Sequence, residues 1–180
     1  KAGKDAYLVG NIGKPYLELL PKLTKESFVV MELSSFQLID LDKSPHIAVV
    51  LNITLDHMDW HKSKEEYVNA KKNIVKYQTK NDFAVINSEY EVSKSFLELT
   101  KAKIILFNKN KLESKYKENL LLRGEHNLEN IAAAVYVAKA LKIKEDIILS
   151  AVRSFKGLEH RLELVRRVKG VTFYNDSFAT

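Results

Sequence analysis

The feature that most constrains the fold is an alternation of short apolar runs with segments of helical periodicity. Apolar runs of strand length occupy residues 6–10, 28–33, 46–53, 83–87, 103–108 and 119–122. Apolar residues recur with helical spacing in residues 15–23, 64–78, 89–100, 127–141 and 145–154. Because strands that alternate with helices build α/β sheets, we predict a mainly parallel sheet flanked by helices.

The pattern changes after Gly157. Residues 160–176 form two segments of alternating polarity joined across Lys169 and Gly170. A short turn that contains glycine between two such segments is typical of a β-hairpin. We therefore predict that the α/β region is followed by a C-terminal hairpin.

Composition excludes several classes of protein. The 180 residues are 46% hydrophobic, enough for one domain with a real core and a second small piece. The net charge of +6 comes from Lys and Arg mixed with Glu, which favours solvated helix faces over a nucleic-acid-binding stripe. The alternative, a non-catalytic basic binding module, has no support other than this charge. The absence of cysteine excludes disulfides and thiolate metal sites.

The sequence also indicates where in the cell the protein acts. No apolar run approaches the roughly 18 residues that a membrane span requires, and no signal peptide opens the chain. We therefore expect a soluble, cytoplasmic protein that acts as a monomer, with neither a membrane nor a nucleic acid as its partner.

Polar side chains follow two of the predicted strands. The apolar residues 29–31 lead into Glu32, Ser34 and Ser35, and the apolar residues 48–51 lead into Asn52. In open parallel sheets, ligands bind beyond the carboxyl ends of the strands, so these residues are candidates for a site. The alternative is that Glu32 and Asn52 only cap the turns that follow.

The loop after Asn52 is rich in possible metal ligands, because it contains Asp56, His57, Asp59 and His61. Carboxylate oxygens and imidazoles suit a hard divalent ion or a zinc-like one. Their spacing matches no standard zinc motif, and Asp is also common in loops because it caps helices. The sequence leaves both interpretations open.

Lys71 occupies an unusual position in the helix predicted for residues 64–78. The apolar face of that helix consists of Tyr67, Val68, Ala70, Ile74, Val75 and Tyr77. Lys71 lies within this face, where an ammonium is costly unless it is paired, deprotonated or chemically altered. The alternative is that its long side chain reaches past the apolar surface to water.

Four polar residues of the C-terminal half are candidates for ligand binding. Asn127 and Asn130 share one face of the first turn of an apolar helix, where Asn127 could be the N-cap or both amides could face a ligand. A planar amide can form two hydrogen bonds with the edge of a nucleobase. Arg161 would suit a phosphate, and Asp176 lies at a predicted strand end.

The segment GNIGKP at residues 10–15 looks like a phosphate-binding loop but fails the test. Its glycines are three residues apart, and Lys14 is followed by Pro15 instead of Ser or Thr. It is therefore not a Walker A loop.

Seven motifs in this order resemble the Mur ligases. They are GNIGKP, ELSSFQL, NITLDHMD, YVNAKK, GEHNLENIAAA, GLEHRLE and NDSFAT, and they run from one end of the chain to the other. GNIG and ELSSFQL resemble the members that add D-glutamate to UDP-N-acetylmuramoyl-L-alanine in cell-wall synthesis. The remaining motifs are shared with other Mur ligases and with folylpolyglutamate synthases, so another amide ligase of this superfamily is the alternative.

The resemblance implies a domain organisation. Residues 1–157 would be the central ATP-binding domain, which is P-loop NTPase-like, without its first strand and phosphate loop. Residues 158–180 would be the start of the C-terminal ligase domain. It follows that the chain by itself should not turn over ATP.

The resemblance also implies catalytic residues. It identifies Lys71 as carbamylated by CO2, which would replace a cation with an anion that can hold Mg2+. Two Mg2+ ions would be held by Glu32, His57 and the carbamate of Lys71. Activity would consist of ATP-dependent amide-bond formation through an acyl phosphate.

Substrate-binding residues follow from the same resemblance. Asn11, Ser34 and Gln37 would contact the UDP-muramoyl substrate, and Thr180 would approach D-glutamate. The nucleotide-binding residues would be Asn127 and Asn130 against the adenine of ATP, together with Arg161 and Asp176. The sequence departs from the family at Phe178, where these ligases commonly carry Lys.

Overall fold

The computed structural model describes residues 2–11, 16–54 and 60–177. The chain divides into two compact units, residues 1–106 and residues 107–180. The expected domain boundary after residue 157 stays a prediction, because compact packing does not define a domain of the family. None of the helices within the described ranges is both long enough and apolar enough to cross a membrane.

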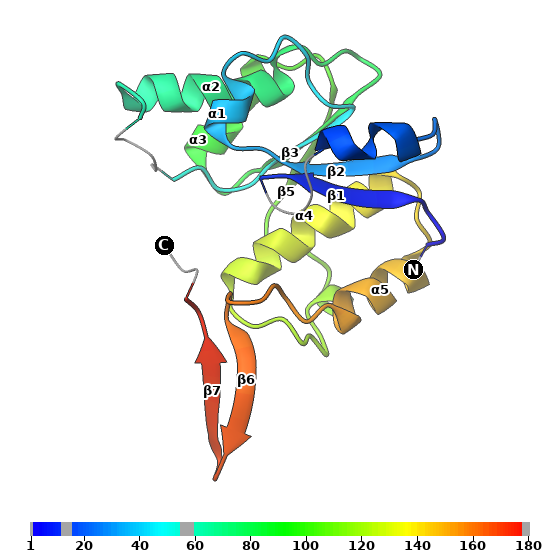
Figure 1. The fold of residues 1–180 in the computed structure, drawn as a ribbon, viewed down its shortest axis with the longest axis vertical. Helices are drawn as coiled ribbons and strands as arrows, with labels where there is room; N and C mark the ends of the chain where they lie inside the picture. Colours follow the sequence, from blue (N-terminus) through cyan, green and yellow to red (C-terminus); the bar gives the residue numbers. More distant parts are fainter. Residues whose placement is uncertain (1, 12–15, 55–59, 178–180) are drawn as a thin grey trace. The chain divides into compact units, whose positions relative to one another are not determined.

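The strands of the first unit form two sheets (Figure 1). β1 (Ala6–Gly10) and β2 (Phe28–Glu32) pair in parallel, with Ala6 opposite Phe28 and Gly10 opposite Glu32. The second sheet has the order β3 (Ile47–Val50), β4 (Phe83–Asn87), β5 (Lys103–Phe107), and β3 and β4 are parallel. The predicted class of fold, parallel strands flanked by helices, is confirmed.

The core of the first unit lies on the second sheet. Its buried cluster consists of Ala48, Val50, Val75, Ala84, Ile86 and Phe96. β4 is buried from Ala84 to Asn87, as expected for the central strand of a covered sheet. The continuous apolar run seen in the sequence therefore corresponds to the best-covered strand.

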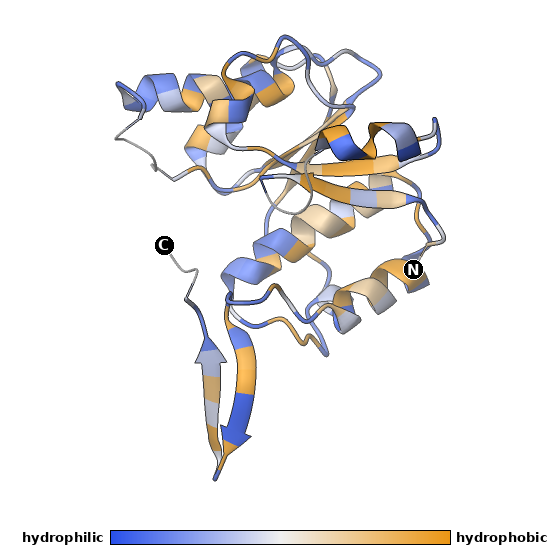
Figure 2. Cartoon of the chain, in the orientation of Figure 1, coloured by the Kyte–Doolittle hydropathy of each residue, from blue (hydrophilic) through white to orange (hydrophobic). Residues whose placement is uncertain are grey.

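The other sheet is less well covered. β2 is mostly orange in Figure 2, yet Val30 is 59% exposed and Met31 is 43% exposed. The described residues of this chain thus leave part of this apolar strand open to solvent.

Two predicted helices of the first unit take a tighter form. Residues 15–23 were expected to be helical, and η1 (Tyr16–Lys22) is a 3-10 helix that contains Pro21. Proline has no N–H to donate and disfavours a continuous α-helix. Residues 89–100 contain α3 (Glu91–Lys94) followed by the 3-10 helix η2 (Ser95–Glu98), where Ser95 Oγ donates to the Val92 carbonyl at 2.7 Å.

The remaining helices of this unit are α1 (Ser35–Leu38) and α2 (Lys64–Lys76). α1 is absent from the sequence-based prediction because four residues carry too little periodicity. α2 begins as predicted, with the Ser63 side chain accepting from the Glu66 N–H at 3.2 Å. The Glu66 carboxylate accepts from the Lys62 N–H at 2.7 Å, one residue before the position that a capping box requires.

The second unit contains η3 (Ser114–Tyr116), α4 (His126–Ala140), α5 (Glu145–Ser154) and the strands β6 (Glu163–Val168) and β7 (Val171–Asn175). Buried Tyr116 connects η3 to α5, because its hydroxyl donates to Glu145 Oε1 at 3.0 Å. Burial, with help from this carboxylate, raises the pKa of Tyr116 to about 12. The tyrosine therefore stays neutral and keeps donating at physiological pH.

The C-terminal hairpin is confirmed, with β6 and β7 antiparallel. Lys169 and Gly170 both have positive φ, 46° and 82°, as a two-residue type I′ turn requires. The short strand expected at residues 119–122 is wrong. Asn119 has a φ of 57°, which is incompatible with an extended strand.

Gly10 determines how closely β1 approaches β2. Its φ is 106°, and a Cβ added there would lie 2.2 Å from the Glu32 carbonyl oxygen. We expect Gly10→Ala to destabilise the protein by at least about 2 kcal/mol, because a left-handed conformation alone costs about 1–2 kcal/mol in a residue with a Cβ. Urea denaturation measures this change in the free energy of unfolding.

Gly3→Ala is the matched control for this substitution. Gly3 also has a positive φ, 66°, but a Cβ there meets nothing within 4 Å. It should show the conformational cost without the clash. Equal losses in the two variants would mean that the close approach to Glu32 is unimportant.

Candidate functional site

Asn11 and Glu32 lie at the same edge of the β1–β2 sheet. Gly10 is opposite Glu32, and the backbone N–H of Asn11 donates to the Glu32 carbonyl at 2.9 Å. Parallel pairing brings the carboxyl ends of both strands together, so these two polar residues become neighbours. This edge is where the sequence predicted a ligand site.

Ser34 and Gln37 begin α1, directly after that edge. Ser34 is the N-cap: its Oγ accepts from the Gln37 N–H at 3.4 Å, while Gln37 Oε1 accepts from the Ser34 N–H at 3.0 Å. This is a complete capping box. The box fixes the direction of both side chains.

Lys71 lies on α2 one turn after Tyr67. It is half-buried, and its Nζ lies 5.0 Å from the centre of the Tyr67 ring, within the range of a cation–π contact. Of the apolar face predicted around Lys71, Tyr67, Ala70 and Val75 are buried, whereas Tyr77 is 41% exposed. Lys71 therefore points along a covered surface and not straight into solvent.

Two predicted site residues, His57 and Thr180, lie outside the described residues, as do Asp56, Asp59 and Phe178. In residues 2–11, 16–54 and 60–177, no group of three His, Cys, Asp or Glu side chains gathers as a metal site would require. The metal-binding roles of Glu32, His57 and Lys71 stay predictions.

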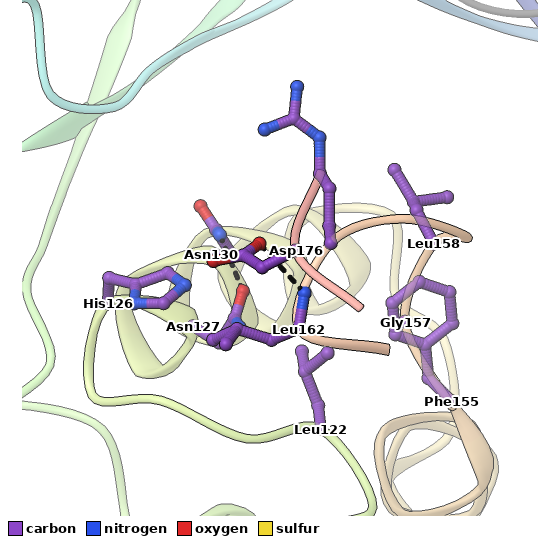
Figure 3. Close-up of a pocket in the computed structure, with 10 residues that line it drawn as sticks. Leu122, His126, Asn127, Asn130, Phe155, Gly157, Leu158, Leu162 and Asp176 are labelled. Carbon is purple, nitrogen blue, oxygen red and sulfur yellow. Dashed lines mark hydrogen bonds between the residues drawn. The ribbon is translucent and has the colours of Figure 1, made fainter. Parts of the chain in front are cut away.

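The second unit contains a pocket of about 410 Å³ (Figure 3). Its lining consists of Leu122, His126, Asn127, Asn130, Phe155, Gly157, Leu158, Arg161, Leu162 and Asp176. All four residues that the sequence analysis assigned to nucleotide binding are in this set. They come from α4, from the segment that precedes β6 and from the residue that follows β7.

Hydrogen bonds hold the polar side of this pocket together. Asn130 Nδ2 donates to Asn127 Oδ1 at 3.0 Å, and Asn127 Nδ2 donates to the Arg123 carbonyl at 2.6 Å. Asp176 Oδ1 accepts from the Leu162 N–H at 3.0 Å, which brings Asp176 next to the residue that follows Arg161. Figure 3 shows the hydrogen bond between the amides of Asn127 and Asn130 and the one between Asp176 and Leu162.

The capping interpretation of Asn127 is wrong. α4 begins at His126 and its N-cap is Glu125, so Asn127 lies inside the first turn. Its side chain reaches back to Arg123 and does not cap the helix. Together with Asn130 it presents an amide pair to the pocket.

Sequence analysis missed the apolar lining of the pocket. Leu122, Phe155, Leu158 and Leu162 come from loops and helix ends, where no periodicity identifies a buried face. Apolar walls with a few polar groups are typical of small-molecule sites, and the volume is within the usual range. The pocket can therefore take a flat, partly apolar ligand whose polar edge meets the two amides and whose anionic part meets Arg161.

Comparison with known proteins identifies the class to which this fold and site correspond. Residues 11–121 match the model of the Mur ligase middle domain. The chain therefore belongs to the Mur ligase family.

Two individual relatives that are similar to this chain share the same name. The chain is 42% identical over 195 residues to a UDP-N-acetylmuramoylalanine–D-glutamate ligase of Pediococcus pentosaceus, covering 98% of this chain and 43% of the relative. It is 38% identical to the Clostridioides difficile protein of the same name, covering 100% of this chain and 45% of the relative. The chain thus spans less than half the length of these curated relatives.

Solved structures support the fold. MurF from Acinetobacter baumannii matches with a TM-score of 0.72 at 19% identity, over 94% of this chain and 44% of that one. A UDP-N-acetylmuramate:L-alanyl-gamma-D-glutamyl-meso-diaminopimelate ligase from Neisseria meningitides matches with a TM-score of 0.59 at 16% identity, over 77% of this chain and 51% of that one.

Proposed function

We propose that this chain is part of a cytoplasmic, monomeric ligase that joins D-glutamate to UDP-N-acetylmuramoyl-L-alanine with consumption of ATP. The observation that carries the proposal is the pocket of the second unit, which gathers Asn127, Asn130, Arg161 and Asp176. Its support comes from relatives named for this activity. They are more than twice as long as this chain, so the proposal concerns the full-length protein.

ATP is the proposed ligand of this pocket. The adenine would lie against the apolar walls with its polar edge on Asn127 and Asn130. Arg161 would neutralise phosphate charge, since its guanidinium suits phosphate oxygens. Asp176 would orient the nucleotide from the end of β7.

The acid substrate is assigned to the first unit. Asn11, Ser34 and Gln37 would bind the UDP-muramoyl substrate near the edge of the β1–β2 sheet, and Thr180 would contact D-glutamate. A carboxylate is a poor electrophile, so ATP would first convert it to an acyl phosphate. The amine of D-glutamate then displaces phosphate. Both steps gather negative charge that cationic groups must neutralise.

Glu32, His57 and Lys71 suit Mg2+ on the condition that Lys71 is carbamylated. The Glu32 carboxylate is a hard oxygen ligand of the type that Mg2+ prefers, whereas an amine such as Lys71 is a poor one. Carbamylation by CO2 would give Lys71 a carboxylate-like end and so complete the set with His57. Two Mg2+ ions bound there would supply charge neutralisation for the phosphoryl group.

Phosphate release by the full-length protein tests this function. We expect release only when ATP, UDP-N-acetylmuramoyl-L-alanine and D-glutamate are all present. Faster release with a different amino acid or a different acid substrate would instead identify another Mur ligase or a folylpolyglutamate synthase-like enzyme. Without release in any of these combinations, the proposal is wrong.

Asn130→Ala tests the nucleotide pocket. Losing one amide that bonds to a nucleobase should raise the KM for ATP in the full-length enzyme about tenfold, since hydrogen bonds contribute about 0.5–1.5 kcal/mol each. The KM for D-glutamate should stay within about twofold, because Asn130 is not assigned to that substrate. Asn110→Ala, at an exposed position of the same unit, is the control. An unchanged KM for ATP in Asn130→Ala would contradict the assignment.

A further inference from the structure

His61 is a buried histidine that none of the roles above uses. It is 3% exposed, and its Nε2 lies 2.9 Å from the Oγ of Ser35, which is 1% exposed. Its Nδ1 is buried and has no hydrogen-bond partner among the described residues. A buried polar atom without a partner costs about 1–3 kcal/mol, so stability alone does not explain a histidine here.

The His61 ring lies between α1 and α2. It stacks on Phe36, with centroids 5.5 Å apart and an interplanar angle of 7°. On its other side it meets the Tyr67 ring edge-on, at 5.2 Å and 75°. The Lys71 Nζ in turn lies 5.0 Å from the centre of the Tyr67 ring. A continuous series of contacts therefore leads from the first turn of α1 to Lys71.

A second residue holds the other end of α1. Asn73 Nδ2 donates to the carbonyls of Leu38 and Ile39 at 2.9 and 3.0 Å. Asn73 thus fixes the C-terminal end of α1 on α2, two residues after Lys71. The bond between Ser35 and His61 fixes the N-terminal end, which is the turn that contains Ser34 and Gln37.

We propose that His61 is a positioning residue for the UDP-muramoyl substrate. Its bond to Ser35 holds Ser34 and Gln37 in a fixed position relative to Lys71. The inference rests on the proposed function, which supplies the substrate roles of these residues. Displacing substrate-binding groups by even about 1 Å can cost up to about 100-fold in rate.

Two substitutions in the full-length enzyme separate positioning from packing. His61→Phe keeps the ring contacts with Phe36 and Tyr67 but loses the bond to Ser35. His61→Gln keeps a polar group able to bond to Ser35 Oγ. His46→Phe is the control, since the His46 side chain is 63% exposed and pairs with Asp82 at 2.8 Å.

We expect the substitution to change the KM for one substrate and not the KM for the other. His61→Phe should raise the KM for UDP-N-acetylmuramoyl-L-alanine about tenfold and leave the KM for ATP within about twofold. Its thermal midpoint should stay near the wild-type value, because removal of the buried Nδ1 offsets the loss of the bond to Ser35 Oγ. His61→Gln should resemble the wild type. Equal rises in both KM values, a lowered midpoint with the same kinetics, or a wild-type KM in His61→Phe would each overturn the inference.

Hydrogen exchange tests the structural part of this inference without a measurement of enzyme activity. The N–H groups of Leu38 and Ile39 donate to the carbonyls of Ser34 and Ser35 at 3.2 and 3.1 Å. In His61→Phe these amides should exchange at least about tenfold faster, while those of α2 stay as in the wild type. Unchanged exchange at Leu38 and Ile39 would overturn the inference. Absent D-glutamate-dependent turnover in the wild type would instead refute the proposed function.

Discussion

Replacing Lys71 with Ala in the full-length protein is expected to reduce ligase activity by roughly 100-fold or more. The physical reason is the loss of the anion that carbamylation would create and of the Mg2+ that this anion would hold. Initial rates of phosphate release, with all three substrates saturating, measure the effect. Removing dissolved CO2 should lower the wild-type rate, and added bicarbonate should restore it.

The matched control is Lys76→Ala. Lys76 is an exposed lysine in the last turn of the same helix, and its amine lies 5.4 Å from the Tyr77 ring centre. Its replacement removes a similar charge and a similar ring contact, yet should leave both the rate and the bicarbonate response unchanged. Wild-type activity in Lys71→Ala, with or without bicarbonate, would contradict the carbamate assignment.

Replacing Phe96 with Ala is expected to destabilise the protein by about 3–5 kcal/mol, the usual cost of removing a fully buried aromatic ring. Phe96 on η2 is fully buried in the cluster formed with β3, β4 and α2. The substitution leaves a cavity in this buried cluster, which also contains the strand residue Ile86. Urea denaturation gives the change in the free energy of unfolding.

Leu99→Ala is the comparison for this substitution. Leu99 lies just after η2 and is 39% exposed, so its loss should cost less than about 1 kcal/mol. If both variants lost the same stability, burial of Phe96 would not be what stabilises this unit.

The elements that were predicted well are those with a local cause. β1, β4 and the β6–β7 hairpin follow from apolar runs, alternation and a turn at Lys169 and Gly170. α2 follows from the Ser63 cap and an apolar face that spans three turns. The strand predicted for residues 119–122 is wrong, and the helices predicted for residues 15–23 and 89–100 are wholly or partly 3-10 helices. Pro21, Ser95 and Asn119 each act on a single turn, and a periodicity averages over such local effects.

Candidate residues were predictable by type and motif, but their surroundings were not. Asn127, Asn130, Arg161 and Asp176 were singled out individually, and only the folded chain brings them into one pocket with Leu122 and Phe155. His61 was grouped with the possible metal ligands, whereas the structure buries it against Ser35 and Phe36.

The sequence by itself determined the secondary structure with strong local signals, the hairpin turn and the motifs that resemble the family. Those features depend on neighbouring residues, whose preferences act over one or two turns of chain. Tertiary structure alone decided the partners of His61 and the apolar walls of the pocket in the second unit. These depend on contacts between segments tens of residues apart, and burial of that kind is set by packing and not by local preference.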